Sequence, residues 1–160
     1  MGKSGKTVDN YQKGGEKMFL GEFQHTIDTK GRVSLPAKFR DGLGEKFYVT
    51  KGLEECLFIF SEAEWTTFSD RLKQLSLAKK EARAFVRFFF GGAAELECDK
   101  QGRMLLPAPL REYAGCKKDA VIVGVGSRIE VWDQERWTNY NDGMIPEVTE
   151  IAEELVELGF

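Results

Sequence analysis

Two stretches of the sequence decide how the chain is organised: residues 28–40, DTKGRVSLPAKFR, and residues 99–111, DKQGRMLLPAPLR. Seven of their thirteen positions are identical at an offset of 71 residues. Further along, LFIFSEAEW at 57–65 aligns with IEVWDQERW at 129–137, at an offset of 72, with apolar positions and the final tryptophan kept. Self-similarity at a fixed spacing indicates a repeated structural unit. The chain therefore consists of two copies of one unit.

Each copy begins with two short strand-like runs around a tight turn. In the first copy these runs are Phe23–Asp28 and Arg32–Leu35. Gly31 can adopt the positive φ that a tight turn needs, and the side chain of Asp28 can accept hydrogen bonds from the backbone ahead of it. We therefore predict a β-hairpin here and its counterpart in the second copy.

Short helices and further strands follow each hairpin. Pro36 and Pro107 stand where helices can begin, because a proline in the first turn loses no intrahelical hydrogen bond. Apolar residues at helical spacing predict two amphipathic helices within 61–90 and further helices after Trp137 and Pro146. Additional strands are predicted at 47–50, 57–60, 120–123 and 129–132, and Ser61 and Asp133 are the predicted N-caps of the helices that follow. The predicted class is α+β, with the amphipathic helices at the periphery.

The composition indicates a soluble globular protein with no membrane span, since 42% of the 160 residues are hydrophobic and no apolar run is long enough. Three cysteines, Cys56, Cys98 and Cys116, show no C-x-x-C spacing, which favours a reducing cytosol over a disulfide framework or zinc knuckle. The net charge is −3, but residues 133–160 alone carry one positive and eight negative charges, so the rest sums to +4. Charged partners must therefore be inferred from local clusters.

Residues 1–17, MGKSGKTVDNYQKGGEK, are polar and without periodicity, and Met18 follows them. We expect this segment to be a disordered leader or an added tag that folding does not need. Its GKSGKT lacks the preceding strand and the four-residue spacer of a phosphate-binding loop, so we expect no nucleotide site there.

Little in the sequence supports catalysis. The chain has one histidine, His25, in an alternating strand, and no serine or cysteine in a recognisable nucleophile turn. A structural, hydrogen-bonding role for His25 and a role as ligand or proton-transfer group both remain open. We expect no enzyme activity, no catalytic residue, no small-molecule substrate, no cofactor and no metal site.

The two Asp-x-x-Gly-Arg turns are the candidate site, because they place an arginine at the same point of both copies. Windows 28–40 and 99–111 carry net charges of +3 and +2. Arginine suits bidentate contact with phosphate or guanine, and a nearby aspartate can hold it in one rotamer. The other interpretation is an internal Asp–Arg pair that only stabilises the turn. Nearby basic residues are Lys30, Lys38 and Arg40 in the first copy and Lys100 and Arg111 in the second.

Residues 18–36, MFLGEFQHTIDTKGRVSLP, and 89–107, FFGGAAELECDKQGRMLLP, closely resemble the bacterial MraZ family. The resemblance covers Met18 to Phe160 and implies two tandem AbrB-like swapped-hairpin β modules that pair as a pseudo-dimer. It also implies a ring-shaped homo-oligomer and a transcriptional regulator at the promoter of the division and cell wall gene cluster. Family DNA-contact roles carry over to Asp28, Arg32, Asp99 and Arg103. Gln101 stands where the first copy has Lys30, so the two turns need not contact DNA equally.

The chain is therefore expected to divide into a leader at 1–17, a first module with a helical hairpin at 18–90 and a second module with C-terminal helices at 91–160. We expect a cytoplasmic, nucleoid-associated regulator that binds direct repeats in double-stranded promoter DNA. Two alternatives remain: a ring-forming interaction scaffold, and an antitoxin-like module that captures a protein through its acidic C-terminal helix. The expected DNA-binding residues are Arg32 and Arg103 as contacts, Asp28 and Asp99 as their positioning partners, and Lys30, Lys38 and Arg40 as phosphate contacts.

Overall fold

A computed structural model describes residues 18–159, so the predictions for 1–17 lie outside the described residues. The first copy of the repeat comprises β1 (Phe19–Thr26), β2 (Arg32–Ser34), α2 (Ala37–Leu43), β3 (Phe47–Lys51), the 3-10 turn η2 (Leu53–Glu55), β4 (Leu57–Ser61), α3 (Glu62–Lys73) and α4 (Lys80–Gly91). The second comprises β5 (Ala94–Leu96), β6 (Arg103–Leu105), α5 (Ala108–Ala114), β7 (Asp119–Gly126), β8 (Ile129–Asp133), α6 (Gln134–Met144), η3 (Ile145–Glu147), α7 (Val148–Leu155) and η4 (Val156–Leu158).

The main sheet has a pseudo-twofold arrangement of the two copies. Its six strands run in the order β1-β7-β8-β4-β3-β5, and every neighbouring pair is antiparallel. Exchanging β1 with β5, β3 with β7 and β4 with β8 reproduces the same order in reverse. The α+β class and the pairing of two modules as a pseudo-dimer are therefore confirmed.

The prediction of two local hairpins is wrong in its pairing. Strand β1 pairs along its whole length with β7, from Phe19↔Gly126 to Thr26↔Asp119, and β2 pairs with β6. The turn itself forms, since Asp28 O accepts the backbone N–H of Gly31 at 2.9 Å. Before the turn, however, Ile27 N–H still bonds to the second copy, at Lys118 O. Strands β1 and β2 of the first copy therefore pair with strands of the second copy.

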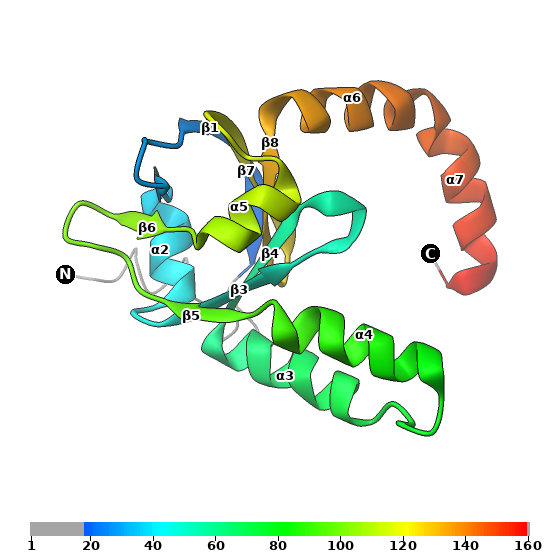
Figure 1. Cartoon of the computed structure of the whole chain (residues 1–160). Helices are drawn as coiled ribbons and strands as arrows, with labels where there is room; N and C mark the ends of the chain where they lie inside the picture. The colour runs from blue at the N-terminus through cyan, green and yellow to red at the C-terminus, as the bar shows by residue number, and fades with distance from the viewer. Residues whose placement is uncertain (1–17, 160) are drawn as a thin grey trace, which may run out of the picture.

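Strands β2 and β6 form a separate two-stranded ribbon, and its strand β6 is labelled at the left of Figure 1. Val33 and Met104 are directly paired in it, and they are 1% and 0% exposed. They join a core with Phe47 and Ile59 of the main sheet. Because side chains alternate along a strand, burying this pair turns the other residues of the ribbon outward.

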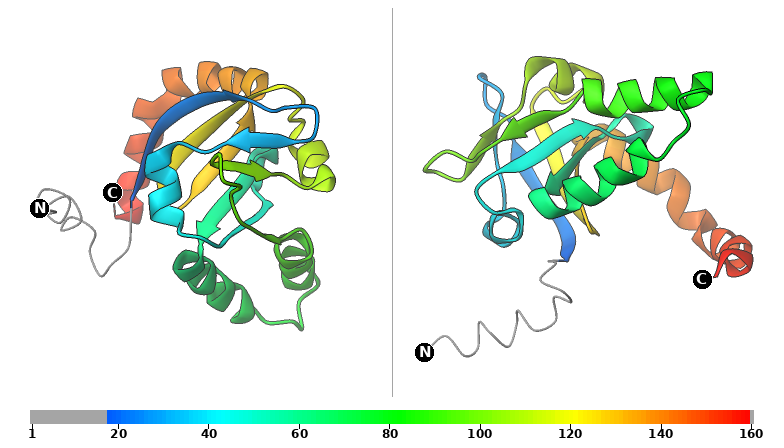
Figure 2. Two further views of the ribbon diagram at one scale, coloured as in Figure 1. Left: turned by 90° about the vertical axis from the view of Figure 1, so that its left-hand side faces the viewer. Right: turned by 90° about the horizontal axis from the view of Figure 1, so that it is seen from below.

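The main sheet is covered on both faces. One face packs against the ribbon and helices α2 and α5, with Phe39 and Leu110 in the shared core. The other face carries Phe58, Phe60, Val121 and Val123, which pack against aromatic residues of α3, α4 and α6. Two cores therefore share one sheet, one on each face. Figure 2 shows the α3–α4 hairpin and the α6–α7 segment leaving the sheet at different places.

Helix boundaries follow the signals in the sequence. The side chain of Ser61 accepts the N–H of Glu64 at 3.3 Å, and that of Asp133 accepts the N–H of Arg136 at 3.2 Å, so both predicted N-caps are confirmed. Pro36 and Pro107 immediately precede α2 and α5, as predicted. Gly44 and Gly115 follow these two helices.

The C-terminal segment extends away from the sheet. Helix α7 follows η3 on the opposite side of the molecule from the β2–β6 ribbon (Figure 1). Two of its apolar residues are open to solvent, with Val148 53% and Leu155 40% exposed. Among the described residues, every helix is too short or too polar to span a bilayer.

Candidate nucleic-acid interface

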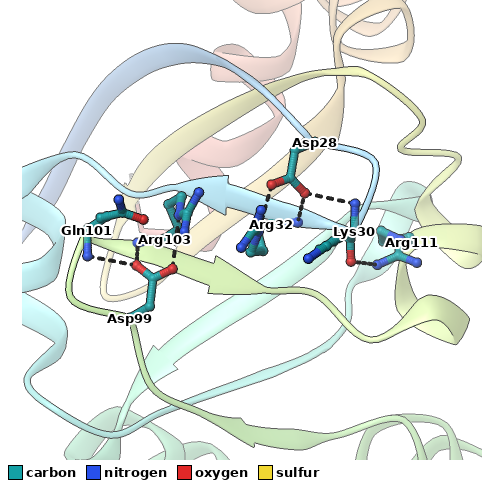
Figure 3. A network of polar contacts seen from close by, with 7 residues as sticks. All are labelled: Asp28, Lys30, Arg32, Asp99, Gln101, Arg103 and Arg111. Carbon is teal, nitrogen blue, oxygen red and sulfur yellow. Dashed lines mark hydrogen bonds and ion pairs between the residues drawn. The ribbon is translucent and has the colours of Figure 1, made fainter.

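The two Asp-x-x-Gly-Arg turns have the same hydrogen-bond pattern. In the first, Oδ1 of Asp28 accepts the backbone N–H groups of Lys30 at 3.0 Å and Arg32 at 2.8 Å. Its Oδ2 accepts Nε–H of Arg32 at 2.7 Å. In the second, Asp99 accepts the N–H of Gln101, the N–H of Arg103 and Nε–H of Arg103, each at 2.9 Å (Figure 3).

These bonds fix both the turn and the arginine. Because the carboxylate of Asp28 accepts backbone N–H bonds, Arg32 N–H above all, together with the Arg32 side chain, its pKa falls to about 2. The same contacts lower the pKa of Asp99, with the backbone of Arg103 the largest cause. Each arginine is held through Nε. Among the contacts recorded for residues 18–159, the terminal amino groups of Arg32 and Arg103 have no partner.

The register of the ribbon places both arginines on one surface. Arg32 pairs with Leu105, and Ser34 pairs with Arg103. These four side chains lie on the face opposite the buried Val33–Met104 pair. Arg32 and Arg103 are diagonal neighbours across the strands, which corresponds to a separation of roughly 7–8 Å between their backbones. Figure 3 shows them side by side at the centre, with Lys30 beyond Arg32 and Gln101 beyond Arg103.

Two further arginines support the turns across the repeat boundary. Arg111 of α5 donates from Nη1 to Leu106 O at 2.7 Å, and its guanidinium lies against Gly31 of the first copy. Arg40 of α2 donates to Leu35 O, and its guanidinium lies against Gly102 of the second copy. Each helix therefore holds the turn of the other module.

The structure brings together most of the predicted site. Asp28, Arg32, Asp99 and Arg103 lie on the ribbon and its turns, and exposed Lys30 lies next to them (Figure 3). Lys38 is exposed on α2, outside the ribbon. Arg40 is half-buried beneath the second turn, where it supports the backbone. Its role as a phosphate contact stays a prediction.

Other candidate groups contribute no second site. His25 lies half-buried in β1 opposite Ala120, and burial lowers the pKa of its imidazole. Cys56 and Cys116 are buried, which raises the pKa of each thiol, to about 12 for Cys116. Within residues 18–159 there is no group of three or more His, Cys, Asp or Glu side chains placed to hold a metal ion.

The role of one ribbon residue and of the two supporting arginines was not predicted from the sequence. Leu105 is 53% exposed on the same surface as Arg32, a position that only the strand register reveals. Arg40 and Arg111 were interpreted only as positive charges near the turns. Both repeats have arginine at this position, which could have indicated a shared structural role.

The geometry suits nucleic acid. The major groove of B-DNA admits a two-stranded β-ribbon, and arginine is the side chain that most often contacts guanine there. Both arginines project from such a ribbon with their terminal donors available.

Comparison with known proteins agrees with the repeat. The family model described as "MraZ protein, putative antitoxin-like" matches the chain twice, at residues 18–88 and 89–157. The chain belongs to the MraZ family. Three MraZ relatives carry the name "Transcriptional regulator MraZ". They come from Carboxydothermus hydrogenoformans (57% identical, covering 88% of this chain and 98% of that protein), Desulfitobacterium hafniense (56%, covering 89% and 99%) and Syntrophomonas wolfei (52%, covering 89% and 99%). This name is that of a regulator and not of an enzyme, which agrees with the prediction from the sequence.

Gly31→Ala should destabilise the protein more than Gly126→Ala. Both glycines have φ +92°, so alanine is strained at either position by about 1–2 kcal/mol. At Gly126 a new Cβ meets open space, whereas at Gly31 it would displace the Arg111 guanidinium. We expect Gly31→Ala to cost about 1 kcal/mol more in free energy of unfolding, measured by urea denaturation, because Arg111 loses its bond to Leu106 O.

The same comparison in an Arg111→Ala background tests the cause. There the Gly31→Ala and Gly126→Ala costs should become equal. A difference that persists without Arg111 would contradict the proposed cross-module support.

The contribution of Asp28 to stability should depend on pH. Its pKa is about 2 in the folded protein against 3.8 for the free side chain, so ionised Asp28 stabilises the fold above about pH 4 and this stabilisation is lost as pH falls towards 2. Asp28→Asn should therefore lower the free energy of unfolding at pH 6, and the difference from wild type should shrink as pH falls from 5 to 3. Asp142→Asn, at an exposed position, is the control. An effect of Asp28→Asn on the free energy of unfolding that does not change with pH would contradict this prediction.

Proposed function

We propose that the chain is a sequence-specific DNA-binding transcriptional regulator that docks the β2–β6 ribbon in the major groove. The observation that carries this proposal is the pair of arginines, Arg32 and Arg103, held by aspartates on the outer face of one antiparallel ribbon. An arginine held in one rotamer loses less conformational entropy on binding DNA. The name of the relatives, "Transcriptional regulator MraZ", supports the same function.

The ribbon residues have distinct roles in this proposal. Arg32 and Arg103 contact base edges and phosphates, and Asp28 and Asp99 position them. Lys30, Lys38 and Arg40 attract phosphates without reading sequence. The protein acts in the cytoplasm, in association with the nucleoid, at the promoter of the division and cell wall gene cluster that the family resemblance implies.

One subunit alone offers few contacts. A handful of phosphate contacts gives a non-specific dissociation constant on the order of 0.1 mM at physiological salt. Several ribbons held in one oligomer can bind successive sites together, which raises affinity by roughly 10²- to 10⁴-fold. We therefore propose that the operator contains short direct repeats about 10 bp apart, so that each ribbon meets the same side of the duplex.

The exposed apolar residues of helix α7 support the proposal of an oligomer. Its apolar residues Val148 and Leu155 and the following Val156 and Leu158 are all at least 40% exposed, and a helix with an apolar face normally buries it. Segment 137–160 carries six acidic and no basic residues, a net charge of −6. A partner surface should therefore be both apolar and basic.

The α3–α4 hairpin of a second copy has this character. Residues 62–91 carry six basic and four acidic residues, a net charge of +2, and expose Leu77 and Phe85. A hollow of about 370 Å³ beside α3 is lined by Phe58, Phe60 and Phe68, among others, with Arg71 and Arg128 also lining it. We propose that α7 of one subunit docks against α3 and α4 of the next, and that repetition of this contact closes a ring.

Arg32→Ala should weaken DNA binding by about 1–3 kcal/mol per engaged subunit, because a base or phosphate contact is lost. Lys38→Ala should cost much less and mainly reduce the salt slope of the binding constant by about one unit. Both are measured by fluorescence anisotropy on promoter duplexes with one, two and three repeats. Half-turn insertions between repeats should weaken wild-type binding, because neighbouring ribbons then face opposite sides of the duplex.

Two results would contradict this proposal. One is equal affinity for all these duplexes. The other is full binding by the Arg32→Ala, Arg103→Ala double mutant, which would leave the turns as structural elements and favour the scaffold alternative.

Leu155→Asp should dissociate the oligomer, because it places a charge in the apolar interface. Thr149→Asp adds the same charge at an exposed polar position of the same helix and should leave the assembly intact. Sedimentation velocity at micromolar concentration measures both, and raising the salt concentration should weaken the charged part of the contact.

A wild-type protein that is monomeric in this experiment would overturn the oligomer proposal. Helix α7 would then be free for another protein, as in the antitoxin-like alternative, and a copurifying partner lost in Leu155→Asp would identify it.

A further inference from the structure

The outer face of the ribbon departs from twofold symmetry. The repeat offset relates Arg32 to Arg103 and Val33 to Met104, so the exposed arginines and the buried pair match between the strands. The remaining pair does not match, because Ser34 of β2 corresponds to Leu105 of β6. One strand thus presents Arg and Ser, and the other presents Arg and Leu.

Leu105 is held close to an arginine. It pairs directly with Arg32. Leu106 N–H bonds to Gly31 O and Leu35 N–H bonds to Gly102 O, each at 3.0 Å, so the intervening Arg32–Leu105 and Ser34–Arg103 pairs are the positions without mutual backbone bonds. Such pairs bring Cα atoms within about 4.5 Å, closer than hydrogen-bonded pairs. Arg32 and Leu105 therefore reach the same part of a groove.

An apolar side chain on a major-groove surface has a specific complement. The C5-methyl of thymine is the apolar group that base pairs present in that groove, alongside donors and acceptors. Leu105 is 53% exposed, whereas its strand neighbours Met104 and Leu106 are fully buried, so its side chain is available to a ligand.

We propose that Leu105 contacts the C5-methyl of a thymine adjacent to the base pair contacted by Arg32, and that Ser34 takes a polar contact at the corresponding place. This inference rests on the proposed DNA binding. A ribbon with identical strands would bind a site equally well in either direction, whereas the Leu105–Ser34 difference gives the ribbon a direction on the duplex. Subunits that each bind in one direction require repeats of one orientation.

The test uses the full-length protein and a synthetic duplex that spans the promoter segment it protects from cleavage. Thymines are replaced one at a time by deoxyuridine, which removes only the C5-methyl group. At one thymine per repeat, the replacement should weaken wild-type binding by about fourfold per repeat. This is the change in affinity expected when one apolar carbon is no longer buried. Leu105→Ala should bind the thymine and uracil duplexes equally.

Matched variants separate this contact from general effects. Leu20→Ala removes another exposed leucine, 64% exposed on β1 outside the ribbon, and should keep the full methyl effect. Leu105→Ser gives both strands the same outward pair, and it should narrow the affinity difference between duplexes with direct repeats and duplexes with one repeat inverted.

The proposal is overturned if no thymine replacement changes wild-type affinity, or if Leu105→Ala keeps the methyl effect. Either outcome leaves the DNA-binding function intact as long as Arg32→Ala still weakens binding. Loss of the function itself would show differently, as absence of wild-type binding to the promoter duplex.

Discussion

Each strand that begins a module is completed by the other module, and this exchange determines where the candidate site lies. If β1 and β2 had paired with each other, Arg32 and Arg103 would stand on separate hairpins. Because β2 pairs with β6, the two arginines become diagonal neighbours on one ribbon. The exchange also explains the order of the main sheet, in which β1 and β5 add to the edges formed by β7 and β3. Folding and assembly of the binding surface are therefore the same event.

The ribbon depends on the rest of the fold. Each strand of the ribbon has only three residues, and a two-stranded ribbon this short is not stable alone in water. Its order comes from the buried Val33–Met104 pair below, and from Arg40 and Arg111 at the two turns. Gly31 and Gly102 adopt the positive φ that the turns need, and because glycine has no Cβ they leave space for these guanidinium groups. The two glycines therefore serve both the turn and the contact between modules.

The sequence predicted what is local and missed what depends on partners. Ser61 and Asp133 cap helices as expected, and the Asp28 turn forms, because each is decided within a few residues. The strand partners were predicted wrongly, since alternating apolar residues show that a strand has a buried face but not which copy supplies its neighbour. Only the family resemblance implied the exchange. Likewise, charge alone grouped Arg40 with Lys38, while the structure places Arg40 beneath a turn and Lys38 in solvent.

An acidic protein can bind DNA in this way because its charges are separated in space. The strongly acidic segment 137–159 lies on the opposite side of the main sheet from the ribbon (Figure 1). Packed layers of secondary structure lie about 10 Å apart, which already exceeds the Debye length of about 8 Å at physiological salt. A phosphate at the ribbon therefore experiences Arg32, Arg103 and Lys30 far more than the carboxylates of α7. In the proposed assembly, the same separation leaves α7 free to contact a neighbouring subunit while the ribbon faces DNA, so one small chain would use opposite sides for assembly and for recognition.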